Sequence, residues 1–180
     1  MRHIAIVVDS RATWTRARTI CEAILARNDL RLQLILVGPL AATIGVGKAG
    51  ESLDNIPVAG NLSVSDLNRP IVELISGYIN GIGIFIHRRQ LDIILSITDR
   101  YESLATAVAA SMSGVLLAHT QGGERTGTLD EAMRHAITKL AQIHFPSNAD
   151  AAQRIIHMGE NPAHVHTVGC PATELLLRVD

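Results

Sequence analysis

Residues 4–10 read IAIVVDS, a continuous aliphatic run that stops at an aspartate and a serine. Five consecutive apolar residues between polar ones are typical of a parallel β-strand buried on both faces. Residues 12–28 then place apolar side chains at the spacing of one helix face, which predicts an amphipathic helix. A second predicted strand, Leu30–Val37, follows directly. The order strand, helix, strand is the opening of a parallel α/β sheet.

The same alternation continues along the rest of the chain. Gly114 ends one of the later helices in the manner of a C-cap glycine. The remaining predicted strands cover residues 91–97, 115–118, 143–145 and 165–168, and the helices that separate them cover residues 102–112, 129–141 and 149–158. Since parallel strands are joined by right-handed crossovers, this pattern predicts a three-layer, doubly wound, Rossmann-like domain over residues 1–180.

Residues 39–65 break the alternation, being rich in Gly, Ala, Ser and Asn with little periodicity. We expect Gly38-Pro39 to end the preceding strand, one short strand near Val58, and mobility around residues 45–55. Ser65 or Asp66 is then expected to cap a long helix that runs to about Arg89.

That long helix contains a strongly apolar segment, residues 71–86. It is shorter than the roughly 20 apolar residues that a membrane-spanning helix needs, and it includes Glu73 and Asn80. Gly77 and Gly81 permit close helix packing, within the domain or against another chain. The segment therefore predicts a buried or interfacial helix without a membrane role, and we expect a homo-oligomer.

Composition excludes several classes of function. Sixteen basic and seventeen acidic residues give a net charge of −1, which offers no electrostatic footprint for nucleic acid or an anionic membrane. Cys21 and Cys170 fit free thiols in a reducing cytoplasm, and no secretory signal pattern opens the sequence. The eight histidines lack metal-ligand spacing, and neither a dinucleotide fingerprint nor a Walker loop is present. We expect no metal and no cofactor.

Polar clusters follow three predicted strands, at residues 9–15, 98–102 and 119–127. In a parallel sheet these loops share the edge at which ligands bind. Asp99 and Glu124, with Arg11 and Arg100, are the charged candidates, because gathering such charges is costly without a ligand.

Each of these residues also has a purely structural interpretation. Arg11 could pair with Asp9, Asp99 could cap the helix that begins near Tyr101, and Glu124 could be a solvated loop charge.

Residues 118–146 read AHTQGGERTGTLDEAMRHAITKLAQIHFP. This stretch resembles the His-x-x-Gly-Gly-Glu…Arg-His-Ala-Ile-Thr-Lys-Leu segment of the hydrolysing UDP-N-acetylglucosamine 2-epimerases, and most of all their sialic-acid-type branch. Shorter matches at residues 10–12, 99–100 and 159–171 extend the resemblance over essentially the whole chain.

The resemblance implies the N-terminal half of a GT-B architecture, with the nucleotide-binding C-terminal domain outside this sequence. It implies elimination of UDP from the sugar to 2-acetamidoglucal and hydration to N-acetylmannosamine, in the cytoplasm. We expect turnover only with a C-terminal half, which a partner chain could supply.

Functional residues carry over by motif. Asp99 and Glu124 would be the acid/base carboxylates, with Glu131 as a third carboxylate near the sugar. Arg134 and His135 would support the loop that carries Glu124. The remaining residues implied to bind the UDP-sugar substrate are Arg11, Thr15, Arg100, Gly122 and Gly123.

The sequence departs from the family pattern at three points: Thr98 replaces a glycine, Thr13-Trp14 replaces Asp-Tyr, and residues 119–121 differ. Two alternatives remain open: a non-catalytic nucleotide-sugar-binding or regulatory module, and half of a split GT-B glycosyltransferase.

Overall fold

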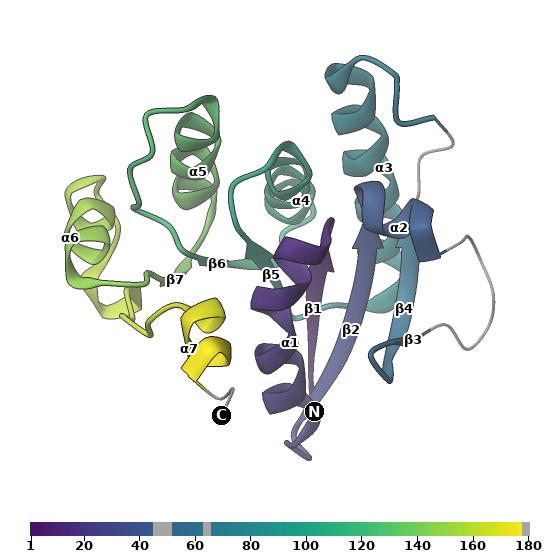
Figure 1. Ribbon diagram of the computed structural model, residues 1–180, viewed down its shortest axis with the longest axis horizontal. Helices are drawn as coiled ribbons and strands as arrows, with labels where there is room; N and C mark the ends of the chain where they lie inside the picture. Colours follow the sequence, from purple (N-terminus) through teal and green to yellow (C-terminus); the bar gives the residue numbers. More distant parts are fainter. Residues whose placement is uncertain (45–51, 63–65, 178–180) are drawn as a thin grey trace.

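A computed structural model describes residues 1–44, 52–62 and 66–177 of the chain. Over these residues the strands form one sheet in the order β3-β4-β2-β1-β5-β6-β7 (Figure 1). The strands are β1 (Arg2–Val8), β2 (Leu30–Val37), β3 (Ser52–Leu53), β4 (Ile56–Leu62), β5 (Ile93–Ile97), β6 (Leu116–Thr120) and β7 (Ile143–Phe145). The helices are α1 (Arg11–Leu25), α2 (Gly38–Ile44), α3 (Ile71–Arg89), α4 (Tyr101–Met112), α5 (Leu129–Leu140), α6 (Ala149–His157), the 3-10 turn η1 (Pro162–His164) and α7 (Pro171–Leu177).

Strand β1 lies near the middle of the sheet and pairs in parallel with β2 on one side and β5 on the other. Every further pair among these strands is parallel, except the short β3–β4 hairpin. The chain builds outward from β1 through β2 and β4, then returns and builds outward through β5, β6 and β7. This reversal confirms the predicted doubly wound fold and places a switch point between β1 and β5.

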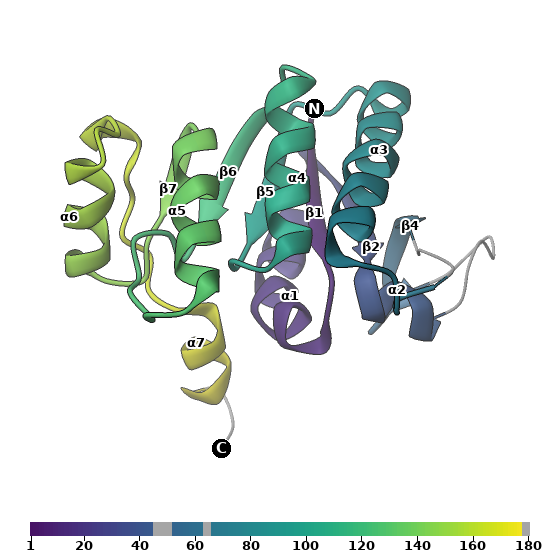
Figure 2. The same cartoon turned by 90° about the horizontal axis from the view of Figure 1, so that it is seen from above.

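Helices cover both faces of the sheet, giving three layers (Figures 1 and 2). Alternate residues of β1 serve the two sides: Ala5 and Val7 pack with α3, α4 and α5, whereas Ile6 and Val8 pack with α1 and α2. Strands buried on both faces explain the unbroken aliphatic runs in the sequence.

The described parts of the region predicted as an irregular loop contain more regular structure than expected. Gly38 and Pro39 end the preceding strand, as predicted, because β2 stops at Val37; the short helix α2, which was not predicted, then starts at Gly38 itself. A strand does pass through Val58, as predicted, but it extends over Ile56–Leu62 and is joined to β3 by a hairpin. Residues 45–51, part of the segment expected to be mobile, lie outside the described residues.

The start of α3 was predicted wrongly. The helix begins at Ile71 with Pro70 as its N-cap residue, and no side chain caps it. The Asp66 side chain instead accepts a hydrogen bond from the backbone N–H of Asn68, and Ser65 lies outside the described residues. The residues just before Pro70 therefore form a turn, and the helix starts only after it.

The strand predicted at residues 165–168 is also wrong. Only Val165 pairs with the sheet, through a single bridge to His144, and the chain then leaves for α7. In the described ranges, no helix combines the length and apolar character needed to cross a membrane.

Candidate active site

The three polar loops meet at one edge of the sheet. Strands β1, β5 and β6 are parallel neighbours, so the residues that follow them emerge side by side at their carboxyl ends. This is the edge at which open α/β sheets bind ligands.

One buried arginine connects two of these loops. Arg134, on α5, is only 4 % exposed. Its guanidinium forms an ion pair with the Asp99 carboxylate and donates to the backbone carbonyl of Glu124 over 2.7 Å. Arg134 therefore contacts the Glu124 loop directly, in agreement with the supporting role that the family resemblance implies for it. Asp99 does not cap α4, whose N-cap residue is Arg100 without a side-chain cap.

The Glu124 carboxylate has a second anchor. Its Oε1 accepts a hydrogen bond from the Ser147 hydroxyl, at 2.5 Å, in the segment that follows β7. A freely solvated loop charge is therefore the wrong interpretation of Glu124. Ser147 was not singled out from the sequence, because a serine beside a proline carries no signal of what it contacts.

The backbone just before Asp99 is strained. Thr98 has a φ of 72°, in the left-handed region that β-branched residues rarely adopt. Its buried hydroxyl has no hydrogen-bond partner among the described residues. The glycine expected here from the family resemblance would adopt this conformation without strain.

His119 holds the strained peptide. It is fully buried on β6, with Nε2 3.1 Å from the Thr98 carbonyl oxygen and Nδ1 3.3 Å from the Thr138 hydroxyl. Burial lowers the pKa of His119 to about 4, so the ring is neutral at neutral pH. A neutral ring donates from Nε2 to the Thr98 carbonyl, which fixes the peptide that precedes Asp99. The sequence placed His119 in a polar loop and missed this role.

A second charged cluster lies beside the first. Arg100 turns toward two buried carboxylates, those of Glu102 at 3.2 Å and Asp9 at 3.7 Å. The hydroxyl of Thr13 donates to Asp9 over 2.5 Å. Asp9 is thus contacted by Arg100 and Thr13, and not by Arg11 as the structural interpretation supposed. Sequence reasoning missed Asp9 and Glu102, because both carboxylates lie at positions where exposed polar residues are usual.

Gly38 closes this cluster from the side of β2. Its φ is 60°, and a Cβ there would lie 2.9 Å from Glu102 Oε1 and 3.3 Å from the Asp9 carbonyl oxygen. The buried phenol of Tyr78 lies nearby, and its pKa is raised to about 12 by burial. In this cluster the buried carboxylates of Asp9 and Glu102 share one partly exposed arginine, Arg100.

Arg11 and Thr15 stand on the first turns of α1, at the same edge. Both are exposed, and the Thr15 hydroxyl donates to the Arg11 backbone carbonyl over 3.0 Å. The helix itself starts because the Ser10 side chain caps the backbone N–H of Thr13. Among the described residues, neither side chain contacts the Asp99–Arg134 pair or the Arg100 cluster, and the Arg11 side chain is exposed to solvent.

Gly122 and Gly123 have packing reasons to be glycine. A Cβ at Gly122 would lie 2.9 Å from the Thr138 hydroxyl, and one at Gly123 would lie 2.2 Å from the Ala151 carbonyl oxygen. Gly123 also has a φ of 77°. Both residues let the loop after β6 lie against α5 and α6, which positions Glu124.

Glu131 closes the same loop from α5. Its Oε2 accepts from the backbone N–H groups of Thr126 and Gly127 at 2.6 and 2.7 Å, and these bonds lower its pKa. His135 lies 3.8 Å from its other oxygen. Within the described residues, the contacts of Glu131 are with its own loop and helix and do not reach Asp99.

No three His, Cys, Asp or Glu side chains gather as metal ligands within the described residues. A cavity of about 360 Å³ lies near the rim, between α1 and α7, and its lining includes Thr120 and Gln121 but neither Asp99 nor Glu124. The chain is thus a Rossmann-like domain with carboxylates and arginines gathered at the carboxyl edge of its doubly wound sheet, the edge at which such sheets bind ligands.

Comparison with known proteins identifies the family. A family model described as UDP-N-acetylglucosamine 2-epimerase matches residues 25–180, and the chain belongs to this family. It is 30 % identical over 182 residues to the UDP-N,N'-diacetylbacillosamine 2-epimerase (hydrolyzing) of Legionella pneumophila, and 29 % identical over 177 residues to the UDP-N-acetylglucosamine 2-epimerase of Neisseria meningitidis. These matches cover 99 % and 98 % of this chain, but 48 % and 47 % of the relatives.

The fold agrees with solved structures of the same family. The UDP-GlcNAc 2-epimerase from Neisseria meningitidis, solved bound to UDP-GlcNAc, superposes with a TM-score of 0.86 at 17 % identity. The match covers 98 % of this chain and 49 % of that one. The domain is thus one half of a GT-B architecture, and the chain spans about half the length of the relatives it matches.

Proposed function

We propose that this chain is the N-terminal half of a hydrolysing UDP-N-acetylglucosamine 2-epimerase and supplies its acid/base carboxylates. The observation that carries the proposal is the Arg134 guanidinium, which holds the Asp99 side chain and the Glu124 backbone together at the ligand-binding edge. The similarity to 2-epimerases along almost the whole chain supports it.

In the proposed reaction one of these carboxylates removes the C2 proton while the bond from C1 to UDP breaks. This yields 2-acetamidoglucal and UDP, and addition of water to the double bond then gives N-acetylmannosamine. A positioned carboxylate typically contributes about 10²–10⁴-fold to such proton transfers. Arg134 orients Asp99 without being a proton donor itself, since a guanidinium stays charged.

The leaving UDP carries charge that needs cationic partners. Arg11 is proposed for this role because it is exposed at the edge next to Asp99, with Thr15 one helical turn further on. Arg100 is also proposed to face the diphosphate. Its side chain is 45 % exposed, so part of it stays accessible although it pairs with Asp9 and Glu102.

Gly122 and Gly123 are proposed to contribute to substrate binding by packing the Glu124 loop closely against α5 and α6, which positions the loop at the ligand-binding edge. Glu131 is proposed as a third carboxylate near the sugar, acting through its Oε1, since Oε2 is already engaged by two backbone N–H groups. No metal or cofactor is needed for this elimination and hydration.

A second domain is proposed to complete the substrate cleft, because an open edge leaves the reacting sugar in water. The test is to supply the C-terminal half of the Neisseria meningitidis relative, fused after residue 180 or as a separate chain. Release of UDP together with N-acetylmannosamine from UDP-N-acetylglucosamine is expected. A folded, assembled pair that leaves the substrate untouched would overturn the proposal.

The sugar is best decided in the same assay. The sialic-acid-type branch predicted from the sequence favours UDP-N-acetylglucosamine, whereas the relative from Legionella pneumophila is named for UDP-N,N'-diacetylbacillosamine. We expect the former to be turned over with the higher kcat/KM. A preference of tenfold or more for the latter would reassign the substrate while keeping the reaction.

The activity is proposed to be cytoplasmic and carried by a homo-oligomer. The cytoplasm fits the free thiols of Cys170 and of Cys21, a buried residue of α1, because a reducing compartment keeps such thiols unpaired.

A further inference from the structure

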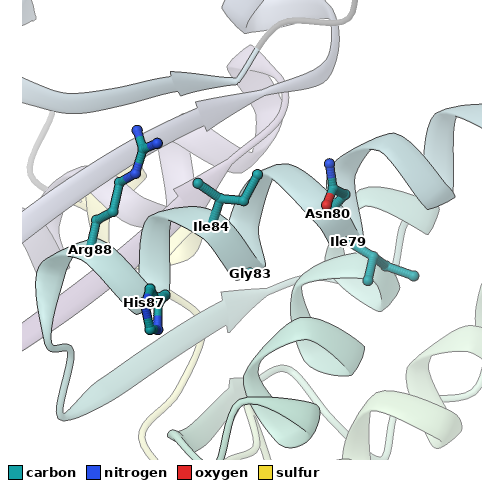
Figure 3. A pocket seen from close by; sticks show the side chains of 6 residues that line it. All are labelled: Ile79, Asn80, Gly83, Ile84, His87 and Arg88. Atoms are coloured by element: carbon teal, nitrogen blue, oxygen red, sulfur yellow. The ribbon is translucent and has the colours of Figure 1, made fainter.

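The segment that follows β7 brings a hydroxyl group to the carboxyl edge of the sheet, and the proposed reaction gives this group no part. The hydroxyl is that of Ser147, which donates to Glu124 Oε1 over 2.5 Å. A shallow cavity of about 540 Å³ on the outer face of α3 lies away from this edge (Figure 3). None of its described lining residues is a carboxylate, and they occupy the half of α3 that leads to the amino end of β5. Ser147 is therefore the stronger candidate for a further role.

The backbone around Glu124 is fixed independently of Ser147. Arg154, on α6, donates to the Gly123 carbonyl over 2.9 Å, and Arg134 donates to the Glu124 carbonyl over 2.7 Å. With the backbone held on both sides, the freedom that remains to Glu124 is rotation about its side-chain bonds. Among the described residues, the hydrogen bond from Ser147 is the contact that restricts this rotation.

The Ser147 hydroxyl is held in turn by the start of α6. Asn148 is the N-cap residue of this helix, and its Oδ1 accepts from the backbone N–H of Ala151 at 2.9 Å. Its Nδ2 donates to the Ser147 oxygen over 3.1 Å. Because an amide N–H group can only donate, the Ser147 oxygen is the acceptor in this contact, and its single hydrogen is left for Glu124. The hydrogen bond from Ser147 to Glu124 thus has a fixed direction.

These contacts make the two oxygens of the Glu124 carboxylate unequal. Oε1 is occupied by Ser147, whereas Oε2 has no hydrogen-bond or ion-pair partner among the described residues. Oε2 is also not one of their buried unpaired oxygens, so a ligand can reach it. A carboxylate exchanges a proton efficiently only when the reacting oxygen stands at hydrogen-bond distance and in the correct orientation.

We propose that Ser147 is a positioning residue of the reaction, whose hydroxyl holds Oε1 of Glu124 and thereby presents Oε2 to the sugar. The proton that Glu124 takes up forms its bond to Oε2 and leaves again from Oε2, while Oε1 keeps the hydrogen bond from Ser147. This inference rests on the proposed function, because it gives Ser147 a task only if Glu124 exchanges a proton with the substrate. A displacement of about 1 Å at a reacting group can cost roughly 100-fold in rate, so loss of the contact should lower kcat.

Replacing Ser147 by threonine and by valine tests this role, because the two side chains have nearly the same shape but only threonine keeps the hydroxyl. In the chain completed with its second half, Ser147→Val is expected to lower the kcat for UDP release at least about tenfold, with KM changed less than about twofold. Ser147→Thr is expected to stay within about threefold of the wild type, since it can still hold Oε1. The added methyl group is common to both variants, and circular dichroism checks that both fold.

The same pair of variants in a Glu124→Gln background separates positioning from a purely structural effect. The difference in kcat between threonine and valine should then disappear, because a side chain that no longer exchanges a proton gains nothing from being positioned. If Ser147→Val is as fast as Ser147→Thr, or if their difference persists in full beside Glu124→Gln, Ser147 is not a positioning residue although the proposed function stands. A completed wild type that releases no UDP would instead overturn the proposed function, and this inference with it.

Discussion

Replacing Thr98 by glycine is expected to stabilise the domain, although the change removes a side chain from the edge of the core. Thr98 has a φ of 72° and carries a buried hydroxyl that finds no hydrogen-bond partner among the described residues. His119 holds its carbonyl, and the next residue is the proposed catalytic Asp99. The strain is thus located at the peptide that positions a reacting group, where strained backbone is often found.

The magnitude follows from four contributions. A left-handed conformation costs a residue with a Cβ roughly 1–2 kcal/mol. Leaving a buried hydroxyl unpaired costs about 1 kcal/mol or more. Against these, glycine loses roughly 0.5–1 kcal/mol through its greater freedom in the unfolded chain, and the lost methyl group forgoes about 0.8 kcal/mol of burial. The net stabilisation is about 1 kcal/mol, equivalent to a rise in Tm of roughly 2–4 °C for a domain of this size.

Thr98→Ala is the matched control, because alanine also removes the hydroxyl but keeps the Cβ that the backbone conformation disfavours. Urea unfolding followed by circular dichroism should rank glycine above alanine by about 0.5–1 kcal/mol, the strain less the entropy of glycine. An alanine variant as stable as the glycine variant, or more stable, would refute the reasoning about strain.

Three further substitutions or conditions test contacts around the site. Arg134→Met should destabilise the domain by about 3 kcal/mol, because the Asp99 carboxylate loses its buried partner, and adding Asp99→Asn should recover part of this loss in urea unfolding. Burial lowers the pKa of His119 to about 4, below its value of about 6.5 in the unfolded chain. The folded domain therefore keeps its full stability above pH 6.5, where the ring is neutral in both states. As the pH falls toward 4, the free energy of unfolding should drop by up to roughly 3 kcal/mol. A His119→Gln variant with the same loss over this range would contradict that assignment. Trp14→Phe should cost about 1 kcal/mol, since the indole N–H donates to Asp54 over 2.7 Å, and a double-mutant cycle with Asp54→Ala that shows no coupling would dismiss the contact.

Much of the fold could be predicted because parallel strands that are buried on both faces appear in the sequence as consecutive aliphatic residues. The second halves of β1 and β2 and most of β5 are aliphatic on both faces, and the helices between the strands keep a regular spacing. Helix α2 escaped prediction because seven residues are too few to establish a period. Residues 165–168 alternate like a strand, yet only Val165 finds a neighbour to pair with. Local pattern specifies an element well only when tertiary pairing agrees with it.

The site was predictable as a set of loops but not as a set of contacts. The order of strands places residues 9–11, 98–100 and 121–124 at one edge, which follows from parallel topology alone. The preference of Arg100 for Asp9 and Glu102 depends on side-chain directions that no spacing rule supplies. The same holds for the neutral His119 beneath the Thr98 peptide, because a buried histidine and a loop histidine look alike in a sequence.

The most direct measurement is the kcat for release of UDP by the chain completed with its second half, with Asp99→Asn and Glu124→Gln compared with the wild type. Each variant is expected to lose at least about 100-fold in kcat while KM changes little, since the amides keep the shape of the carboxylates but cannot accept the proton. Glu22→Gln, an exposed carboxylate on the outer side of α1, serves as the control and should keep wild-type kcat. If either Asp99→Asn or Glu124→Gln turns over substrate as fast as this control, the pair held by Arg134 is not the acid/base machinery of the enzyme.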